Sequence, residues 1–280
     1  MVIRILVIDN MHIKNRNALQ RYKNIEIIFS KDISLINNFD YIYSPSIPIN
    51  VRLYPNKKIV FGPHFCVLPH GITNRISINS KYLQPSEWVV NLWKEYEEGR
   101  KLDLCACPFG VDTDRFCETN QERSKVFIYF KRRKPEELGY LQNFLSKKGI
   151  DYRIFDYVKR YNEYEYLDYI QKSKYGIILD AHESQGFAIE EALSCNVPLL
   201  VWNVRLLSQE YGSNYPNTFA TSIPYWDGRC GEYFYDRDEL ELTFNKFVSN
   251  IEKREYKPRE YVLENLSMEV CEKRFMKLFK

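Results

Sequence analysis

Two glutamates, Glu183 and Glu191, stand on either side of a glycine turn and have the chemistry to hold a polyhydroxylated ligand. They belong to the segment 180–203, DAHESQGFAIEEALSCNVPLLVWN, which follows the apolar run YGIILD. A buried strand that ends in polar residues brings them to the carboxyl edge of an open sheet, where α/β folds bind ligands. Glu183 on the loop can accept a hydrogen bond from a sugar hydroxyl, and Glu191 can accept one from a ribose diol. The segment therefore indicates a nucleotide-sugar site.

A short helix is expected between the turn at Gly186 and the polar break at Asn196 and Pro198. Glycine permits the tight turn, asparagine suits a left-handed helix end, and proline cannot continue the helix. The unpaired amides at the start of such a helix carry partial positive charge and can face a diphosphate. The residues expected to present or surround these amides are Ser184, Gln185, Gly186 and Phe187.

A second candidate for ligand chemistry is a basic cluster that follows the predicted strand 126–130 and consists of Lys131, Arg132, Arg133 and Lys134. Pro135 then opens a helix, where its missing amide hydrogen is no loss. Guanidinium groups fork onto two phosphate oxygens and an ammonium group acts as a point charge, so the cluster is a candidate phosphate clamp. A solvated charge run or a nuclear-localisation patch is the alternative interpretation.

The spacing E-x7-E, running into EALSCNVP, resembles the donor-site signature of retaining glycosyltransferases with the GT-B fold, especially family 4. The residues that match its commonest form are Glu183, Glu191, Ala192, Cys195, Val197 and Pro198. Ser184, Gln185, Glu190 and Asn196 depart from that form, while Gly186 keeps one glycine. The segment 107–116, CPFGVDTDRF, is similar to the stretch that joins the first domain of these enzymes to the second.

The resemblance implies a GT-B fold, in which two Rossmann-like, doubly wound α/β domains face each other across a cleft. The expected boundaries are an acceptor-side domain at 1–107, a linker at 108–118, a donor-binding domain at 119–262, and a helix at 263–280 that crosses back to the first domain. It implies transfer of a sugar, hexosyl in type, from a UDP- or GDP-linked donor to a hydroxyl on a glycan, lipid or protein. Retention of the anomeric configuration, with no metal and no separate cofactor, is expected by the same analogy.

Site roles also follow from the resemblance. Lys131 and Arg133 would hold the diphosphate and neutralise the leaving group, with Arg132 beside them or directed elsewhere. Glu183 would hold the sugar and Glu191 the ribose. His64, in FGPHFCVLPHG, would contact a sugar hydroxyl from the first domain, although a histidine at a turn is as often structural. The expected catalytic residues are His64, Lys131, Arg133 and Glu183, and the expected donor-binding residues are Lys131, Arg132, Arg133, Glu183, Ser184, Gln185, Gly186, Phe187 and Glu191.

Three alternatives remain open at the level of the sequence. The pair Asp112 and Asp114 forms a D-x-D of the metal-dependent kind, but it follows a Pro-Phe-Gly break and is interpreted as coincidence. The short first domain is compatible with an inactive GT-B protein that binds a sugar nucleotide or a glycan. A nucleotide-sugar epimerase or a phosphorylase would share the fold and the glutamates.

Composition limits the class of protein. The chain has 280 residues, enough for two domains of ordinary size. Its net charge of +3 gives no electrostatic case for a nucleic-acid partner, and no segment approaches the roughly 20 apolar residues that cross a bilayer. Seven scattered cysteines suggest reduced thiols, and the amino terminus reads as a strand rather than a signal peptide. A cytoplasmic location is expected, with peripheral attachment to a membrane left open, and the oligomeric state is not indicated.

The apolar pattern alternates between strands and helices as β-α-β units do. In the first half it predicts strands at 3–9, 25–30, 39–44, 57–62 and 75–82, and helices at 14–22 and 86–99, the latter capped by Ser86. In the second half it predicts strands at 126–130, 151–157, 175–180 and 198–203, and helices from 135, at 162–173, 187–195, 236–254 and 267–280. The segment 221–234 resembles the loop and strand near the end of the second domain of the GT-B enzymes. A run of tyrosines, Tyr157, Tyr161, Tyr164, Tyr166 and Tyr169, is expected to line a nucleobase pocket or, more often, to pack in the core.

Overall fold

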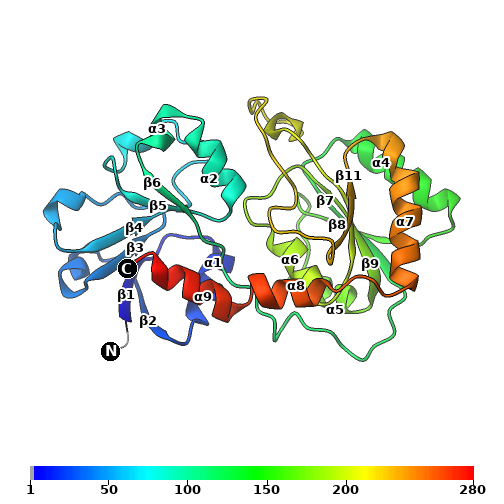
Figure 1. The fold of residues 1–280 in the computed structure, drawn as a ribbon, viewed down its shortest axis with the longest axis horizontal. Coiled ribbons are helices and arrows are strands. Elements are labelled where there is room, and N and C mark those ends of the chain that lie inside the picture. The colour runs from blue at the N-terminus through cyan, green and yellow to red at the C-terminus, as the bar shows by residue number, and fades with distance from the viewer. Residues whose placement is uncertain (1–2) are drawn as a thin grey trace. The chain divides into compact units, whose positions relative to one another are not determined.

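The computed structural model describes residues 3–280 and divides the chain into two compact units (Figure 1). The first unit holds the described residues up to Gly110 together with Leu266–Lys280, and the second holds Val111–Asn265. Each unit is built on its own parallel sheet.

The sheet of the first unit has six strands in the order β2-β1-β3-β4-β5-β6, and every neighbouring pair is parallel. Residues 5–8 of β1 are fully buried, as expected for a strand covered on both faces. The strands are β1 (Ile3–Ile8), β2 (Ile25–Ser30), β3 (Tyr41–Ser44), β4 (Lys58–Phe61), β5 (Lys81–Gln84) and β6 (Asp103–Ala106).

Helices cover this sheet, and Trp93 of α2 stacks on Tyr82 of β5 in the hydrophobic core of the unit. Ser86 occupies the N-cap position of α2, as predicted, with Glu87 in the first turn. The helices are α1 (Ile13–Gln20), α2 (Glu87–Lys94), α3 (Glu97–Arg100) and α9 (Met268–Lys277), with 3-10 turns η1 (Ile33–Asn38), η2 (Val51–Leu53) and η3 (Ile72–Asn74).

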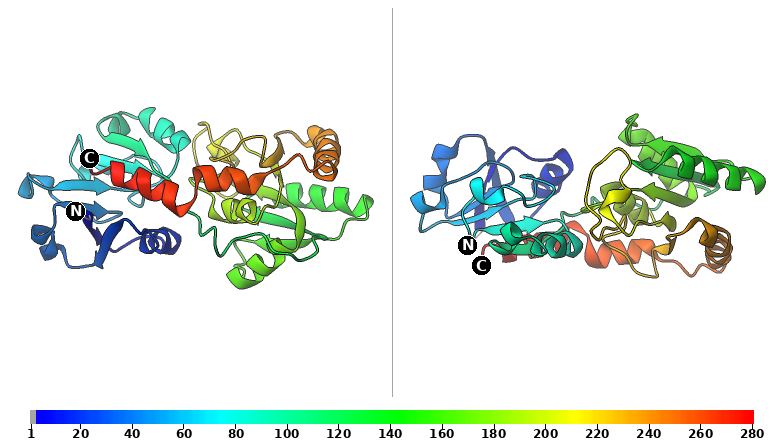
Figure 2. Two further views of the ribbon diagram at one scale, coloured as in Figure 1. Left: turned by 60° about the horizontal axis from the view of Figure 1, so that its bottom comes forward. Right: turned by 90° about the horizontal axis from the view of Figure 1, so that it is seen from above.

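Helix α9 is the last element of the chain and packs within the first unit (Figures 1 and 2). The ring of Phe275 lies 5.2 Å from the ring of Tyr43 on β3 and 5.9 Å from that of Tyr22. The Glu272 carboxylate accepts hydrogen bonds from the backbone and side-chain amides of Asn24, at 2.5 and 2.8 Å. The chain thus leaves the first unit once and returns to complete it.

The sheet of the second unit has the order β11-β10-β9-β7-β8 and is also parallel throughout. Because β9 lies beside β7 and β8 lies on the other side of β7, the direction in which the sheet grows reverses between β7 and β9. The strands are β7 (Lys125–Lys131), β8 (Arg153–Asp156), β9 (Ser173–Asp180), β10 (Leu199–Trp202) and β11 (Gly231–Phe234).

The helices of the second unit form two groups. Within each group the helices contact one another. Phe144 of α4 meets Phe244 of α7, and both helices share a core with the buried side chains of the sheet. The Tyr166 hydroxyl of α5 donates to the carbonyl of Ala188 in α6, and α6 packs against α8. These helices are α4 (Pro135–Lys147), α5 (Glu163–Gln171), α6 (Phe187–Ser194), α7 (Leu240–Glu252) and α8 (Pro258–Asn265), with η4 (Leu207–Gln209) and η5 (Arg237–Glu239).

The expected doubly wound α/β architecture is confirmed in both units, but several elements differ from the sequence-based expectation. The helix predicted at 86–99 is divided into α2 and α3. The strand predicted at 75–82 is wrong, since only Lys81–Gln84 is extended there. Asn79 has a positive φ of 62°, which ends any extended run before it. The prediction also lacked β6 and α8, whose sequences DLCA and PREYVLEN carry little apolar periodicity.

The tyrosines of the run 157–169 differ in their burial. Tyr166 is 1% exposed and packs edge-on against Phe155 and Phe127, so it belongs to the core. Tyr157 is 44% exposed, and its ring lies 4.7 Å from the Lys131 ammonium group. Core packing therefore accounts for Tyr166 but not for Tyr157.

Candidate functional site

The candidate site begins where β7 and β9 end, at the reversal point of the second sheet. Lys131 and Asp180 are the last residues of these strands and are paired in register, and the Ala181 amide donates to the Lys131 carbonyl at 3.1 Å. After β7 the chain continues towards β8, and after β9 it continues towards β10, on the other side. The two loops therefore diverge, and such a point is where open α/β sheets bind ligands.

Lys131 and Glu183 form an ion pair at this point. The Lys131 Nζ donates to Glu183 Oε1 at 2.5 Å, and the two side chains are only 15% and 14% exposed. The lysine comes from the basic cluster and the glutamate from the E-x7-E segment. Two sequence features 52 residues apart are therefore joined in one place.

Burial and charge act against each other in this pair. Burial alone would lower the pKa of Lys131, but the carboxyl groups of Asp180 and Glu183 raise it above its ordinary value. Burial alone would raise the pKa of Glu183, but the Lys131 ammonium holds it below its ordinary value. Burial raises the pKa of Asp180 well above its ordinary range, with Lys131 opposing the shift and Glu183 adding to it. The pair is thus charged at neutral pH, whereas Asp180 favours its protonated form.

Helix α6 starts beside Glu183. Gly186 is its N-cap residue and has φ 93° and ψ 50°, a left-handed conformation that favours glycine. A β-carbon at this position would lie 3.3 Å from Glu183 Cβ, so the turn and the glutamate are packed together. The amides of the first turn of α6, from Phe187 onward, are the end of the helix that attracts anions.

The other end of α6 confirms the expected stop at Asn196. This residue has a positive φ of 60°, and its amide and that of Val197 donate to carbonyls of the last turn. Arg123 donates to the carbonyls of Cys195 and Asn196, both at 2.7 Å. The helix is therefore fixed by hydrogen bonds beyond its own.

Three further carboxyl or amide groups of the segment are buried. Glu191 is 4% exposed, and after burial its charge is the largest cause that raises the pKa of Tyr161. Glu190 is 1% exposed and accepts from the Gln185 side-chain amide at 3.0 Å. Gln185 is thereby directed to Glu190, whereas Ser184 is exposed on the loop.

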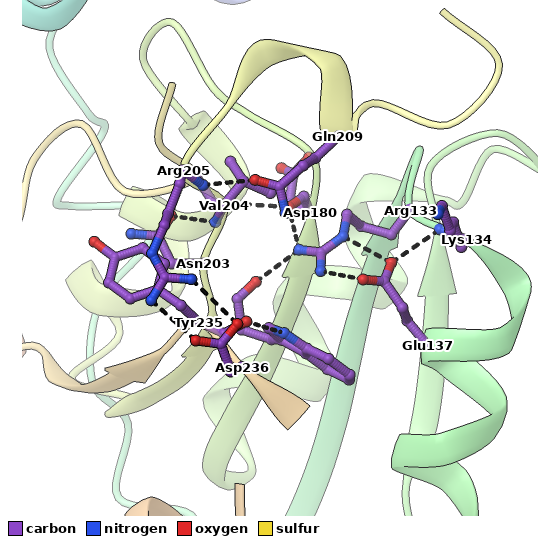
Figure 3. A network of polar contacts seen from close by, with 12 residues as sticks. Arg133, Lys134, Glu137, Asp180, Asn203, Val204, Arg205, Gln209, Tyr235 and Asp236 are labelled. Carbon is purple, nitrogen blue, oxygen red and sulfur yellow. Dashed lines mark hydrogen bonds and ion pairs between the residues drawn. The ribbon is translucent and has the colours of Figure 1, made fainter. Parts of the chain in front are cut away.

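The expected role of Arg133 is corrected by the structure (Figure 3). Its guanidinium group is 1% exposed, forks onto the Glu137 carboxylate at 2.6 and 2.9 Å, and donates to the carbonyls of Asp180 and Trp202. With these acceptors already in place, the side chain is committed to joining β9, β10 and α4. Arg133 therefore positions the end of β9 and leaves the candidate phosphate-binding set.

Arg132 takes the more exposed position. Its side chain is 49% exposed, and Nη1 donates to Glu210 Oε1 at 3.0 Å. The other oxygen of Glu210 lies 2.7 Å from His182 Nε2, next to Glu183 in the sequence. Burial alone would raise the pKa of Glu210, but His182 and then Arg132 hold it below its ordinary value. No sequence pattern indicates Glu210, because it lies in a loop without a recognisable motif.

His64 belongs to the first unit and lies in the loop after β4. Its Nε2 lies 2.9 Å from Asn15 Nδ2, and its ring lies 6.4 Å from that of His12. Loss of hydration, followed by repulsion from His12, lowers the pKa of His64 to about 4, although the residue as a whole remains exposed. The ring is thus neutral near pH 7 and can donate or accept a hydrogen bond.

Within residues 3–280, no group of three or more His, Cys, Asp or Glu side chains is gathered as a metal site would require. Of the D-x-D pair, Asp112 accepts from the Arg115 amide at 3.2 Å, as in a turn. Asp114 is exposed.

Several solved structures are similar to this chain. The apo form of the lipopolysaccharide outer core galactosyltransferase WaaB is 12% identical, with a TM-score of 0.52 over 99% of both chains. Sucrose-phosphate synthase from Thermosynechococcus elongatus is 8% identical, with a TM-score of 0.54 over 92% of this chain and 81% of that chain. The catalytic domain of starch synthase IV from Arabidopsis thaliana, bound to ADP and acarbose, is 10% identical, with a TM-score of 0.53 over 88% and 74%.

The chain has the GT-B fold. This confirms the fold expected from the resemblance at the E-x7-E segment. Neither the protein-family models nor the curated proteins give a match to the GT-B chain. Among the helices described in it, none is long and apolar enough to span a bilayer.

Proposed function

We propose that this protein is a glycosyltransferase that moves a sugar, hexosyl in type, from a nucleotide-diphosphate donor to a hydroxyl acceptor. The observation that carries the proposal is the ion pair of Lys131 and Glu183 at the reversal point of a GT-B sheet, beside the start of α6. A cation for phosphate and a carboxylate for hydroxyl groups are the two kinds of group that a nucleotide sugar needs. UDP- or GDP-linked sugars are the donors we favour.

Lys131 has the central role in this proposal. An ammonium group has three donors, so Lys131 can keep its bond to Glu183 and still donate to a phosphate oxygen. Its positive charge and the first-turn amides of α6 would stabilise the charge that develops on the departing diphosphate. Arg132, exposed at the same turn, would add a second cation in place of Arg133.

The carboxylates would orient the donor. Glu183 would accept a hydrogen bond from a sugar hydroxyl, while its pairing with Lys131 keeps it ionised. Glu191 would accept from the ribose diol, and the exposed ring of Tyr157 over Lys131 offers a face for the base. His64 remains our candidate for a contact to the sugar from the first unit, because a neutral ring can serve as donor or acceptor.

Retention of configuration, independence of metal and a cytoplasmic location remain parts of the proposal. Retention and metal independence rest on the resemblance at the E-x7-E segment. The cytoplasmic location rests on the seven scattered cysteines.

The proposal is tested with UDP, GDP, ADP, CMP and their common sugar conjugates in a thermal-shift panel without added metal. A ligand that binds only the folded protein at about 100 times its Kd adds about 2.7 kcal/mol to its stability. We expect one diphosphate family to raise Tm in the wild type, and the rise to be lost in Lys131→Met and in Glu191→Ala. Lys148→Met, which removes a cation at the far end of α4, is the matched control and should keep the rise.

Product analysis with the stabilising donor then decides the reaction. Transfer to an added hydroxyl acceptor, or slow hydrolysis of the donor, supports a transferase. Interconversion of two sugar nucleotides without acceptor would replace the proposal by an epimerase. The absence of any stabilising nucleotide, with and without manganese, would refute the donor site itself.

A further inference from the structure

Asp180 is a buried acid that the proposed reaction does not yet use. It is 0% exposed at the end of β9, and neither of its carboxyl oxygens receives a hydrogen bond from a donor among residues 3–280. Its backbone is fixed, because the Asp180 carbonyl accepts from Arg133 Nη1 at 3.2 Å and from the Ser222 hydroxyl at 2.8 Å. These bonds hold the backbone that carries the side chain in place.

Lys131 and the carboxyl group of Glu183 are the charged neighbours that act on the Asp180 carboxyl group, and the interaction with Glu183 raises the pKa of Asp180 while it lowers that of Glu183. Two ionised carboxylates only accept hydrogen bonds, so this contact is favourable only if one of them carries a proton. Glu183 is the one that bonds to Lys131 and stays ionised. The proton therefore belongs on Asp180.

We propose that Asp180 is a positioning residue that carries a proton and donates it in a hydrogen bond to the Glu183 carboxylate, so that the donor's diphosphate meets a site without excess negative charge. This inference rests on the proposed function. With Asp180 neutral, Lys131 and Glu183 cancel each other's charge. With Asp180 ionised, the cluster would carry a net negative charge and repel a diphosphate at close range.

The groups around Asp180 are consistent with this assignment. Among Lys131, Asp180 and Glu183, only Lys131 carries an ammonium group, and this group donates to Glu183. Arg133 faces the carbonyl of Asp180, and its remaining bonds go to Glu137 and Trp202. The titratable or charged groups that face or adjoin Asp180 are Lys131 and Tyr129 on β7, Arg133 after β7, and His182 and Glu183 after β9.

The proton can be observed directly on the full chain without any ligand. A protonated carboxyl group has an infrared C=O band separate from that of a carboxylate. At pH 7, the difference spectrum between wild type and Asp180→Asn should contain this band, whereas that between wild type and Asp236→Asn, an exposed carboxylate paired with Arg205, should not. Glu183→Gln should also lose the Asp180 band, because Lys131 would then be free to pair with Asp180.

Two infrared results would overturn the proposal. One is the absence of a protonated-acid band from the Asp180→Asn difference. The other is persistence of the Asp180 band in Glu183→Gln, which would show that burial alone, and not the contact with Glu183, holds the proton.

Nucleotide binding tests the consequence for the site. With UDP and GDP as probes, we expect Asp180→Ala to weaken binding by about tenfold, the amount expected for loss of a hydrogen bond to a charged group. Asp180→Asn, which keeps a neutral donor, should restore binding. Equal loss in both variants would overturn the proposal. If neither nucleotide binds the wild type, the proposed function fails, while the infrared result still decides whether Asp180 holds the proton.

Discussion

Three of the four basic residues at the end of β7 and just after it have a carboxylate partner: Lys131 pairs with Glu183, Arg132 with Glu210, and Arg133 with Glu137. These pairs differ in exposure, and this difference separates their roles. Arg133 is buried and donates hydrogen bonds to backbone carbonyls, whereas Arg132 is half-exposed and can exchange its carboxylate partner for a ligand. In this run of four basic residues, Arg133 thus has a structural role, and the others remain candidates for ligand binding.

Glu190 offers a prediction about stability. It is buried, one of its oxygens has no hydrogen bond in the described part of the chain, and burial raises its pKa well above the ordinary value. The folded state therefore holds a proton that the unfolded state releases above about pH 4.5, so stability falls as pH rises. We expect Glu190→Gln to raise the free energy of unfolding by about 1 kcal/mol at pH 7, and the gain to vanish below about pH 4.

Urea unfolding of Glu190→Gln and wild type at several pH values measures this gain. Glu252→Gln, on the exposed end of α7, is the control and should leave the pH dependence unchanged. A gain that is the same at all pH values would show that Glu190 is ionised in the folded protein.

The environment of His64 predicts that the stability of the folded protein falls at acid pH. Its pKa is lowered to about 4, first by loss of hydration and then by His12, whereas an unfolded histidine titrates near about pH 6.5. The unfolded state gains a proton before the folded state does, so stability is lost as pH falls through this window. We expect His64→Gln to flatten the fall in Tm between about pH 6.5 and about pH 4. An unchanged slope in His64→Gln would contradict this assignment.

The residue-level prediction from sequence succeeded where a motif fixed geometry. The E-x7-E spacing, the glycine turn and the asparagine stop place Glu183, Gly186 and Asn196 as expected. It failed at Arg133 because neighbouring side chains of one turn point in different directions, and sequence alone does not say which is enclosed. Asp180 and Glu210 carry no motif, since their importance comes from burial and from partners distant in the chain.

At the scale of elements, the turn before α6 ties the helix to Glu183. Gly186→Ala would force a left-handed residue to carry a β-carbon 3.3 Å from Glu183 Cβ. We expect it to lower the free energy of unfolding by about 1–2 kcal/mol and to weaken nucleotide binding, because the glutamate must shift. Gly139→Ala, inside α4 with no atom within 4 Å of the new carbon, is the control and should stabilise by up to about 1 kcal/mol.

Urea unfolding and the thermal-shift panel measure both effects. If Gly186→Ala binds nucleotide as the wild type does, the turn does not position the site. Equal stability changes in the two variants would mean that the left-handed conformation at Gly186 is not retained.

Most strands and long helices could be predicted, because parallel strands buried on both faces read as continuous apolar runs. The exceptions depend on tertiary contacts. β6 begins with a charged residue and is only DLCA, and it extends because it pairs with β5. α8 is fixed by Arg259, whose guanidinium donates to the carbonyls of Thr113, Phe116 and Ser194. These distant partners are not visible in local patterning.

At the scale of the whole molecule, α9 should be essential to the first unit. Phe275 is 1% exposed against Tyr22 and Tyr43, so Phe275→Ala should destabilise this unit by about 3–5 kcal/mol. Because the two units need not unfold together, hydrogen exchange is the measurement, with faster exchange expected in β1 and β3.

Leu242→Ala, at a leucine on α7 that is 78% exposed, is the control for Phe275→Ala and should change exchange nowhere in the first unit. Unchanged exchange of β1 and β3 in Phe275→Ala would show that α9 does not contribute to the stability of the sheet.

The return of α9 also fixes the order in which the molecule can be finished during synthesis. All six strands of the first sheet leave the ribosome before residues 111–265, but the helix that covers Tyr22 and Tyr43 leaves after them. At about 5–20 residues per second, the second unit takes roughly 8–30 seconds to make. During that interval the aromatic side chains of the nascent first unit lack their cover and are open to chaperones. The unit whose sheet is made first is therefore completed only after the other unit has been made.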